Sequence, residues 1–348
     1  MKVSFSRKNR GFAVIIALVA ITVLALLAGT FAYSMKVETC LAANANNDEA
    51  FYWIGRGGVE RACWWKALDG NQPFSSKLQY WAGGPGDGPE TNSPLASESL
   101  DNFSIGPGTV SLTFTELESQ INVNTAAAPL IQQVLNTMGV DANDVSVVSD
   151  SILDWIDADD DTRPAGAESD YYQGLNPPYL AKNAPMDRRE ELLLVKGVTY
   201  NMYYGISSAG SQTPYPEHKL GFGHAPGKEP DYAFGLRDVF TPFSSGKINL
   251  LTVNNSVLLS ILDNDPNAVQ AINTARGSDP PIRDVNQLLA AAGVNPAAFG
   301  PFQPYVGNRG DVYEVVATAT ISGISHEYTA IIYRKGSNVQ VVSFYRTK

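Results

Sequence analysis

Three absences limit what this chain can be. Only two of its 348 residues are cysteine (Cys40 and Cys63), so it is not a small domain built on disulfides. It has neither a glycine-rich phosphate-binding loop nor a Gly-x-Ser-x-Gly nucleophile motif. Its three histidines, His218, His224 and His326, are remote from its densest acidic run, and His218 and His224 lie in a Pro/Gly-rich loop. We therefore predict no zinc site, no catalytic residues and no enzymatic activity.

The first part of the chain contains a long uncharged stretch and no proline. No charged residue occurs between Arg10 and Lys36, and no proline occurs in residues 1–72. About 20 apolar residues suffice for a membrane-spanning helix, whereas a secretory signal has an apolar core of only 7–15. We predict a helix that spans the membrane and continues to about Leu68, which an ordinary single-pass anchor also explains. On one such helix Cys40 and Cys63 lie about 34 Å apart, too far to bridge each other.

Positive charge is scarce after residue 11. Residues 1–11 carry four basic residues and no acids, which keeps this end in the cytoplasm by the positive-inside rule. Residues 12–348 then hold 21 Lys and Arg against 35 Asp and Glu. Such a surface repels nucleic acid and anionic lipid headgroups.

Strand patterns lie on both sides of a long helical region. The stretch FSIGPGTVSLTFTELE predicts a hairpin that bends at Gly-Pro-Gly, and β-branched and aromatic strands follow after residue 300, with turns at Ser322-Gly323 and Lys335-Gly336-Ser337. We therefore predict an α+β fold, in which the long amino-terminal helix packs on an antiparallel sheet. Residues 121–300 form a large, mainly helical insertion.

Weak repetition occurs within this insertion. The segments QINVNTAAAPLIQQVL (120–135) and KINLLTVNNSVLLSIL (247–262) share Ile-Asn and a following helix, for which Asn or Thr suits the N-cap. Three helices end in Leu-x-x-x-Gly-Val, at residues 135–140, 193–198 and 289–294. These endings also resemble the helix-hairpin-helix units of DNA-binding proteins. However, residues 121–300 hold 11 basic against 21 acidic residues, which excludes counterion-driven DNA binding and favours helix caps.

An acidic loop is the one place where the sequence indicates chemistry. Asp157, Asp159, Asp161 and Glu168 occupy positions 1, 3, 5 and 12 of a twelve-residue window, the carboxylate spacing of an EF-hand. Thr162 replaces the glycine that an EF-hand needs, and Pro164 interrupts the loop, so we predict a local loop for structural Ca²⁺. Additional candidate ligands nearby are Asp154, Asp160 and Asp170. A solvated acidic loop, or carboxylates that hold a catalytic Mg²⁺ or Zn²⁺, are the alternatives.

The segment Lys8-Asn9-Arg10-Gly11-Phe12 resembles the class III signal of type IV pilins and of the pseudopilins of type II secretion. The resemblance implies that prepilin peptidase cleaves between Gly11 and Phe12 and that Phe12 becomes N-methylated, while the apolar helix stays as an anchor. Most members carry Glu at the fifth mature position, where this chain has Ile16. A carboxylate at that depth is costly unless it is paired, and a foremost subunit has no neighbour to pair with. Its absence resembles the K-type minor pseudopilin of the filament tip, although Ile16 is also an ordinary apolar residue.

The insertion carries three segments similar to those of the K-type family, namely Ile121 to Ala126, LDWIDADDDTRPAGAESDYY and EELLLVKGV. The resemblance implies a pilin-like fold with a calcium-binding inserted domain. It implies a leader (1–11), a transmembrane helix (12–35), a helix continuation with loop and first strands (36–120), the insertion (121–300) and the last strands (301–348).

The same resemblance implies a structural protein of the inner membrane that faces the periplasm and initiates and caps the pseudopilus in protein export. Its implied partners are the I- and J-type minor pseudopilins, the major pseudopilin and prepilin peptidase, with no nucleic acid among them. A tip minor pilin of a type IV pilus is the alternative within the same architecture.

Overall fold

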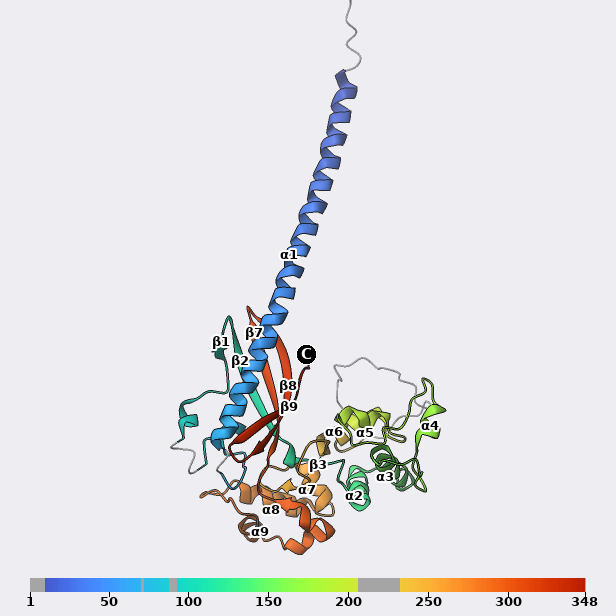
Figure 1. Cartoon of the computed structure of the whole chain (residues 1–348), viewed down its shortest axis with the longest axis vertical. Helices are drawn as coiled ribbons and strands as arrows, with labels where there is room; N and C mark the ends of the chain where they lie inside the picture. The colour runs from blue at the N-terminus through green and yellow to red at the C-terminus, as the bar shows by residue number, and fades with distance from the viewer. Residues whose placement is uncertain (1–9, 70–71, 88–92, 206–231, 348) are drawn as a thin grey trace, which may run out of the picture.

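A single long helix leads into the globular part of the molecule. The computed structural model describes residues 10–69, 72–87, 93–205 and 232–347. Helix α1 (Arg10–Leu68) comprises 59 residues, and Figure 1 shows its first half projecting away from everything else. Residues Val14–Thr39 have a mean hydropathy of 2.8 and are not buried by the rest of the chain. This confirms the predicted apolar helix, which is long enough to cross a membrane.

The second half of α1 packs on a five-stranded antiparallel sheet of order β1-β2-β7-β8-β9. The strands are β1 (Phe103–Ile105), β2 (Gly108–Glu116), β7 (Val312–Ile321), β8 (Ile324–Lys335) and β9 (Asn338–Arg346). Buried and less buried residues alternate along β7, because one sheet face meets α1. Gly55 and Gly58 permit this contact, since an added Cβ would lie 2.4 Å from Tyr328 and 2.7 Å from Val110.

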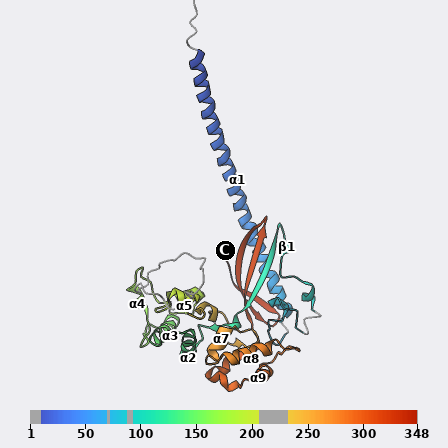
Figure 2. The ribbon, with the colours of Figure 1, turned by 180° about the vertical axis from the view of Figure 1, so that it is seen from behind.

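The predicted turns occur where the glycines are. Ser322 and Gly323 connect β7 to β8 with φ of 50° and 82°, and Gly336 connects β8 to β9 with φ of 64°. Glycine tolerates this left-handed conformation without steric cost. Figure 2 shows these strands from behind, with β1 at one side of the sheet.

The insertion is longer than the sequence predicted. The sequence placed it at 121–300 and the last strands at 301–348, whereas the sheet is interrupted between Glu116 and Val312. The reason is that residues 296–307 form a 3₁₀ segment, η8 (Pro296–Tyr305), and a short strand, β6 (Val306–Gly307), which pairs inside the insertion. The insertion has its own hydrophobic core, separate from the core between α1 and the sheet.

The insertion is built from short elements. Its helices are α2 (Ala128–Met138), α3 (Ala142–Ile156), α4 (Ser169–Gln173), α5 (Tyr200–Tyr204), α6 (Leu236–Val239), α7 (Asn255–Ile261), α8 (Pro266–Arg276) and α9 (Val285–Ala292). The other short elements are η6 (Leu117–Ser119), η7 (Arg189–Leu194), β3 (Ile121–Asn122), β4 (Phe240–Thr241) and β5 (Ile248–Asn249). Before it, the loop after α1 holds η3 (Tyr80–Ala82) and η5 (Pro94–Ser97).

Both copies of the Ile-Asn repeat play the same structural role. Ile121-Asn122 pairs in parallel with β4, and Ile248-Asn249 pairs in parallel with β6. In each copy the asparagine Oδ1 accepts a hydrogen bond from the backbone N–H two residues on, at 2.9 Å. The repetition is therefore structural, and both copies contribute to the single hydrophobic core of the insertion.

The predicted helix ends are only partly as expected. Gly139 and Gly293 are the left-handed C-caps of α2 and α9. Gly197 also has a positive φ, but it follows the 3₁₀ segment η7 and not an α-helix. Asn254 caps α7 by accepting from Val257 N at 2.8 Å, whereas the N-cap of α2 is Ala127, which has no side-chain acceptor.

Candidate functional site

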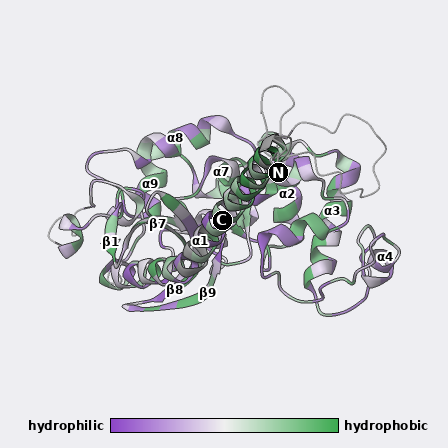
Figure 3. Ribbon diagram, turned by 90° about the horizontal axis from the view of Figure 1, so that it is seen from above, coloured by the Kyte–Doolittle hydropathy of each residue, from purple (hydrophilic) through white to green (hydrophobic). Residues whose placement is uncertain are grey.

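The acidic loop follows α3, on the side of the molecule away from the sheet. Figure 3 looks at the molecule from above, with β1, β8 and β9 on one side and α3 and α4 on the other. Asp154 is fully buried in the last turn of α3, and Asp157 is the C-cap of that helix. Glu168 is the N-cap residue of α4 and is 3% exposed. The loop thus brings three of the predicted carboxylates toward the interior.

Glu168 has a buried carboxylate. Among the described residues, neither of its carboxylate oxygens has a hydrogen-bond partner. Burial, followed by the negative charges of Asp154, Asp157, Asp160 and Asp159, raises the pKa of Glu168 to about 7. One oxygen of Asp157, Oδ1, is also buried without a partner in the described part of the chain. A buried carboxylate in this setting lacks the positive charge that would stabilise its ionised form.

Arg163 supplies a cationic contact to two of these carboxylates. Its Nη1 lies 2.6 Å from Oδ1 of Asp154 and also bonds to the carboxylate of Asp157. Its backbone N–H donates to Oδ2 of Asp154 at 3.2 Å. Hydrogen bonds to both carboxylates raise the pKa of Arg163.

The backbone of the loop is held by other residues. Lys196 Nζ donates to the carbonyls of Ala165 at 3.3 Å and Gly166 at 2.8 Å. Gly166 lies so close to Asp154 that an added Cβ would be 1.9 Å from its Oδ2. The ring of Trp155 meets that of Tyr172 edge to face, with centroids 5.2 Å apart, and both side chains are buried. The loop therefore lies next to a pair of buried aromatic side chains.

The remaining predicted ligands lie further out. Asp159 Oδ1 accepts from Asp161 N at 3.0 Å, and Asp160 Oδ1 accepts from Asn183 Nδ2 at 2.9 Å. Asp161 and Asp170 are exposed. Within the described ranges, no three His, Cys, Asp or Glu side chains are gathered closely enough to hold a metal ion as they stand. Arg163 therefore joins Asp154 to Asp157, and the charges of both act on buried Glu168, whereas Asp161 and Asp170 stay exposed.

The side chains of the loop offer oxygen donors only. Carboxylate oxygens are hard ligands, which Ca²⁺ and Mg²⁺ prefer and zinc does not. His326 stacks on Phe51 at 3.9 Å, between α1 and the sheet, while His218 and His224 lie outside the described residues. The oxygens of Glu168 and Oδ1 of Asp157 are thus buried polar atoms to which the described residues supply no hydrogen-bond partner.

Sequence reasoning missed Arg163, although it is the single basic residue between 157 and 168. It also missed Asn183, whose Oδ1 is buried without a partner among the described residues and whose amide contacts Asp160. The spacing of acids drew attention to carboxylates alone. A lone cation in a run of acids is the signal that would have found Arg163.

A second polar cluster lies between the sheet and the insertion, and no motif indicated it. Lys66 Nζ lies 2.5 Å from Asp69 Oδ2, which Arg334 Nη1 also contacts at 3.1 Å, and all three residues are buried. Asn249 Nδ2 donates to both oxygens of buried Glu116, at 3.0 Å each. These bonds connect the end of α1, two strands of the sheet and the second repeat.

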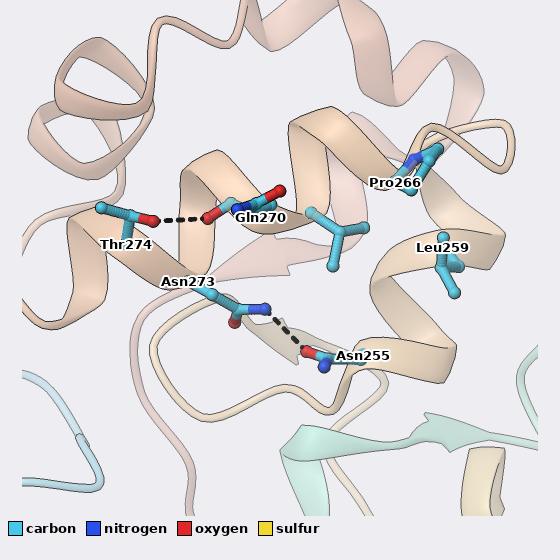
Figure 4. A pocket seen from close by; sticks show the side chains of 7 residues that line it. Asn255, Leu259, Pro266, Gln270, Asn273 and Thr274 are labelled. Atoms are coloured by element: carbon cyan, nitrogen blue, oxygen red, sulfur yellow. Dashed lines mark hydrogen bonds between the residues drawn. The ribbon is translucent and has the colours of Figure 1, made fainter.

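A shallow pocket between α7 and α8 offers no chemistry. Figure 4 shows Asn255, Gln270, Asn273 and Thr274 along it, with Asn273 Nδ2 donating to Asn255 Oδ1 at 2.9 Å. None of the seven described residues that line it is ionisable. This pocket therefore supports neither acid–base catalysis nor a charged ligand.

Comparison with known proteins agrees with the motifs. Residues 110–208 match the family model described as type II secretion system, protein K. A type II secretion system protein K of Aeromonas hydrophila is 23% identical over 217 residues, which cover 57% of this chain and 61% of that protein. A putative type II secretion system protein K of Escherichia coli K12 is 36% identical over 76 residues, 22% of this chain and 23% of that protein.

The fold agrees over most of the chain. The crystal structure of the GspK-GspI-GspJ complex of the type 2 secretion system of enterotoxigenic Escherichia coli contains a chain that aligns with a TM-score of 0.65 and 16% identity. The alignment covers 88% of this chain and 99% of that one. Together, the family model, the relatives and the shared fold support a type II secretion system protein K, the family that the motifs also indicate.

Proposed function

We propose that this protein is the minor pseudopilin at the tip of the pseudopilus, where it initiates and caps the filament during export across the outer membrane. Its role is structural and not catalytic. The observation that carries the proposal is the place of the insertion, which lies at the end of α1 opposite the apolar segment (Figure 1). A filament of stacked helices grows along this direction, so a bulky insertion there leaves no room for a subunit ahead.

The apolar segment is consistent with the same position. Ile16 is 54% exposed on α1 and carries no charge. A foremost subunit gains nothing from a carboxylate at this depth, because no neighbour ahead provides a partner. The basic stub that precedes Phe12 supports a periplasmic location of the sheet and the insertion, because the positive-inside rule keeps such a stub in the cytoplasm.

The exposed side of α1 provides the surface for partner subunits. Trp53, Trp64 and Leu68 are 61%, 44% and 42% exposed. At 100° per residue these three positions fall within about 60° of one face of the helix. Exposed aromatic side chains on one face are typical of a protein interface. We assign this face to the helices of I- and J-type minor pseudopilins. Prepilin peptidase would act on the chain before assembly, and the major pseudopilin would join the filament afterwards.

Co-purification tests this function. The full-length protein in detergent should retain the I- and J-type subunits of its own secretion system, and the double change Trp53→Glu and Trp64→Glu should release them. Val342→Glu is the control, because Val342 is 58% exposed on β9, away from this face. Failure of the wild-type protein to retain either subunit would contradict the function, whereas retention by the double variant would contradict only the assigned face.

We also propose that the acidic loop binds Ca²⁺ and thereby stabilises the insertion. The buried and unpartnered oxygens of Glu168 and Asp157, beside Asp154, support this proposal. When bound, the ion would supply the positive charge that Glu168 lacks. Asp159, Asp161, Asp160 and Asp170 remain candidate ligands that this loop would have to bring closer.

A further inference from the structure

Arg163 occupies the place in the acidic loop where a cation would be expected. It is the only basic residue from 157 to 168, in a stretch with five acidic residues. Its guanidinium contacts Asp154 and Asp157, the two carboxylates that lie beside Glu168. Its side chain thus contacts two carboxylates that a divalent ion would also bind.

These contacts are strong ones by geometry. The 2.6 Å contact from Nη1 to Asp154 joins two full charges, and Asp154 is completely buried. Charge-assisted hydrogen bonds of this kind are roughly twice as strong as neutral ones. The backbone N–H of Arg163 donates to the same carboxylate, so Asp154 is held from two directions. A divalent cation on the same carboxylate would lie close to the guanidinium, and repulsion between the two positive charges opposes the binding of both.

The guanidinium can leave without dismantling the loop. The side chain of Arg163 is 36% exposed, so solvent reaches it directly. The following residues are fixed independently, because Lys196 binds the carbonyls of Ala165 and Gly166 and Asp150 accepts from Ala165 N at 3.2 Å. Rotation of one side chain into solvent would therefore free Asp154 and Asp157 while Glu168 stays in place.

We propose that Arg163 is an internal competitor of the calcium ion, which holds the loop together when calcium is absent and sets the affinity when calcium is present. This inference rests on the proposed calcium binding of the loop. A ligand that binds only the form with Arg163 released has an apparent affinity reduced by the fraction of molecules in that form. The competitor therefore shifts the calcium concentration at which the insertion becomes fully stabilised.

Calcium titration calorimetry of the full-length protein in detergent, after treatment with chelator, tests the inference. Arg163→Gln should bind calcium at least about tenfold more tightly than the wild-type protein, which corresponds to about 1.4 kcal/mol. In chelator, the same variant should melt at a lower temperature than the wild-type protein, because the loop has lost its internal cation. Lys247→Gln is the matched control, since it also removes one positive charge from the insertion, but Lys247 Nζ donates to the carbonyl of Pro304 and lies outside the acidic loop. Its calcium affinity should change less than about threefold.

The outcomes separate the two proposals. If Arg163→Gln and the wild-type protein bind calcium equally, or if Lys247→Gln tightens binding as much, competition by Arg163 is wrong while calcium binding stands. If neither protein binds calcium, both proposals fail. Should Arg163→Gln not fold in chelator, Arg163→Lys provides the second test. Lysine has one ammonium group and cannot form the forked contacts of a guanidinium, so this variant should bind calcium more tightly than the wild-type protein. An unchanged or lower affinity contradicts the inference.

Discussion

Asn249 donates from one amide nitrogen to both carboxylate oxygens of Glu116, at 3.0 Å each, across 133 residues of sequence. Glu116 is the last residue of β2, and Asn249 belongs to the second Ile-Asn repeat. The same amide donates to the carbonyl of Ser75 at 2.9 Å. This buried contact fixes the insertion to the sheet, because it joins the strand that leads into the insertion to β5 inside it.

The first prediction concerns the pH dependence of this junction. Burial, followed by the charge of Glu118, raises the pKa of Glu116 from 4.5 to about 7. Stability contributed by the neutral carboxyl is thus complete below about pH 4.5 and is lost as pH rises through about 7. Glu116→Gln keeps an acceptor for Asn249 and cannot ionise. Between pH 5 and pH 8, the free energy of unfolding of the variant should improve relative to wild type by about 1 to 3 kcal/mol.

Urea unfolding of the full-length protein in detergent, followed by tryptophan fluorescence, measures this difference. Glu60→Gln, on the exposed side of α1, reports what the same chemical change does at the surface. A difference between Glu116→Gln and wild type that is constant across this pH range would show that Glu116 does not titrate there.

The fold was predictable where the sequence has a clear period or a clear break. The unbroken apolar run indicated the start and extent of α1, alternation indicated β2 and β7, and Gly323 and Gly336 marked the turns. The bounds of the insertion were not predictable, because β3 to β6 are two residues each and have no period. Such pairings are set by the tertiary packing around them.

The site was predictable to a similar degree. The spacing of acids indicated Asp157 and buried Glu168, but it indicated exposed Asp161 equally, because spacing along the chain does not fix which side chains turn inward. The buried cluster of Lys66, Asp69 and Arg334 could not be found, because 265 residues separate Asp69 from Arg334. Only the folded chain shows that these charges are buried together.

The second prediction concerns processing. We expect prepilin peptidase to cut between Gly11 and Phe12, because the basic stub stays in the cytoplasm and the apolar helix is too long for ordinary signal cleavage. Mass spectrometry of the mature amino terminus should detect N-methylated Phe12. Gly11→Val should block the cut, since it places a branched side chain at the cleavage position. An intact Met1 in the wild-type protein, or a cut beyond Ala28, would contradict the assignment.

The third prediction concerns the missing carboxylate at Ile16. Ile16→Glu should not improve export and should lower the amount of protein in the membrane, because an unpaired charge at bilayer depth costs several kcal/mol. Ile16→Leu is the control, since it keeps an apolar side chain at the same place. Membrane fractionation and the amount of exported protein in the medium measure both effects. A clear gain in export by the Ile16→Glu variant would mean that the subunit has a neighbour ahead of it and is not at the tip.

The last prediction concerns calcium and the stability of the insertion. A metal that binds only the folded protein stabilises it by about 2.7 kcal/mol when free metal is a hundred times its Kd. For a domain of this size, removal of calcium with a chelator should lower the melting temperature by roughly 5 to 10 °C. Calcium should restore it, while magnesium should do so poorly, because a loop interrupted by Pro164 suits irregular coordination better than a strict octahedron.

Asp157→Ala combined with Glu168→Ala should abolish the difference between the two conditions, since these residues hold the buried oxygens without partners among the described residues. Asp144→Ala should keep the full response, because Asp144 is an exposed acid at the opposite end of α3. Calorimetry of the full-length protein in detergent resolves the two cases. A wild-type melting curve that is the same with chelator and with calcium, from micromolar to millimolar, would mean that the acidic loop is only solvated and that Arg163 alone neutralises it.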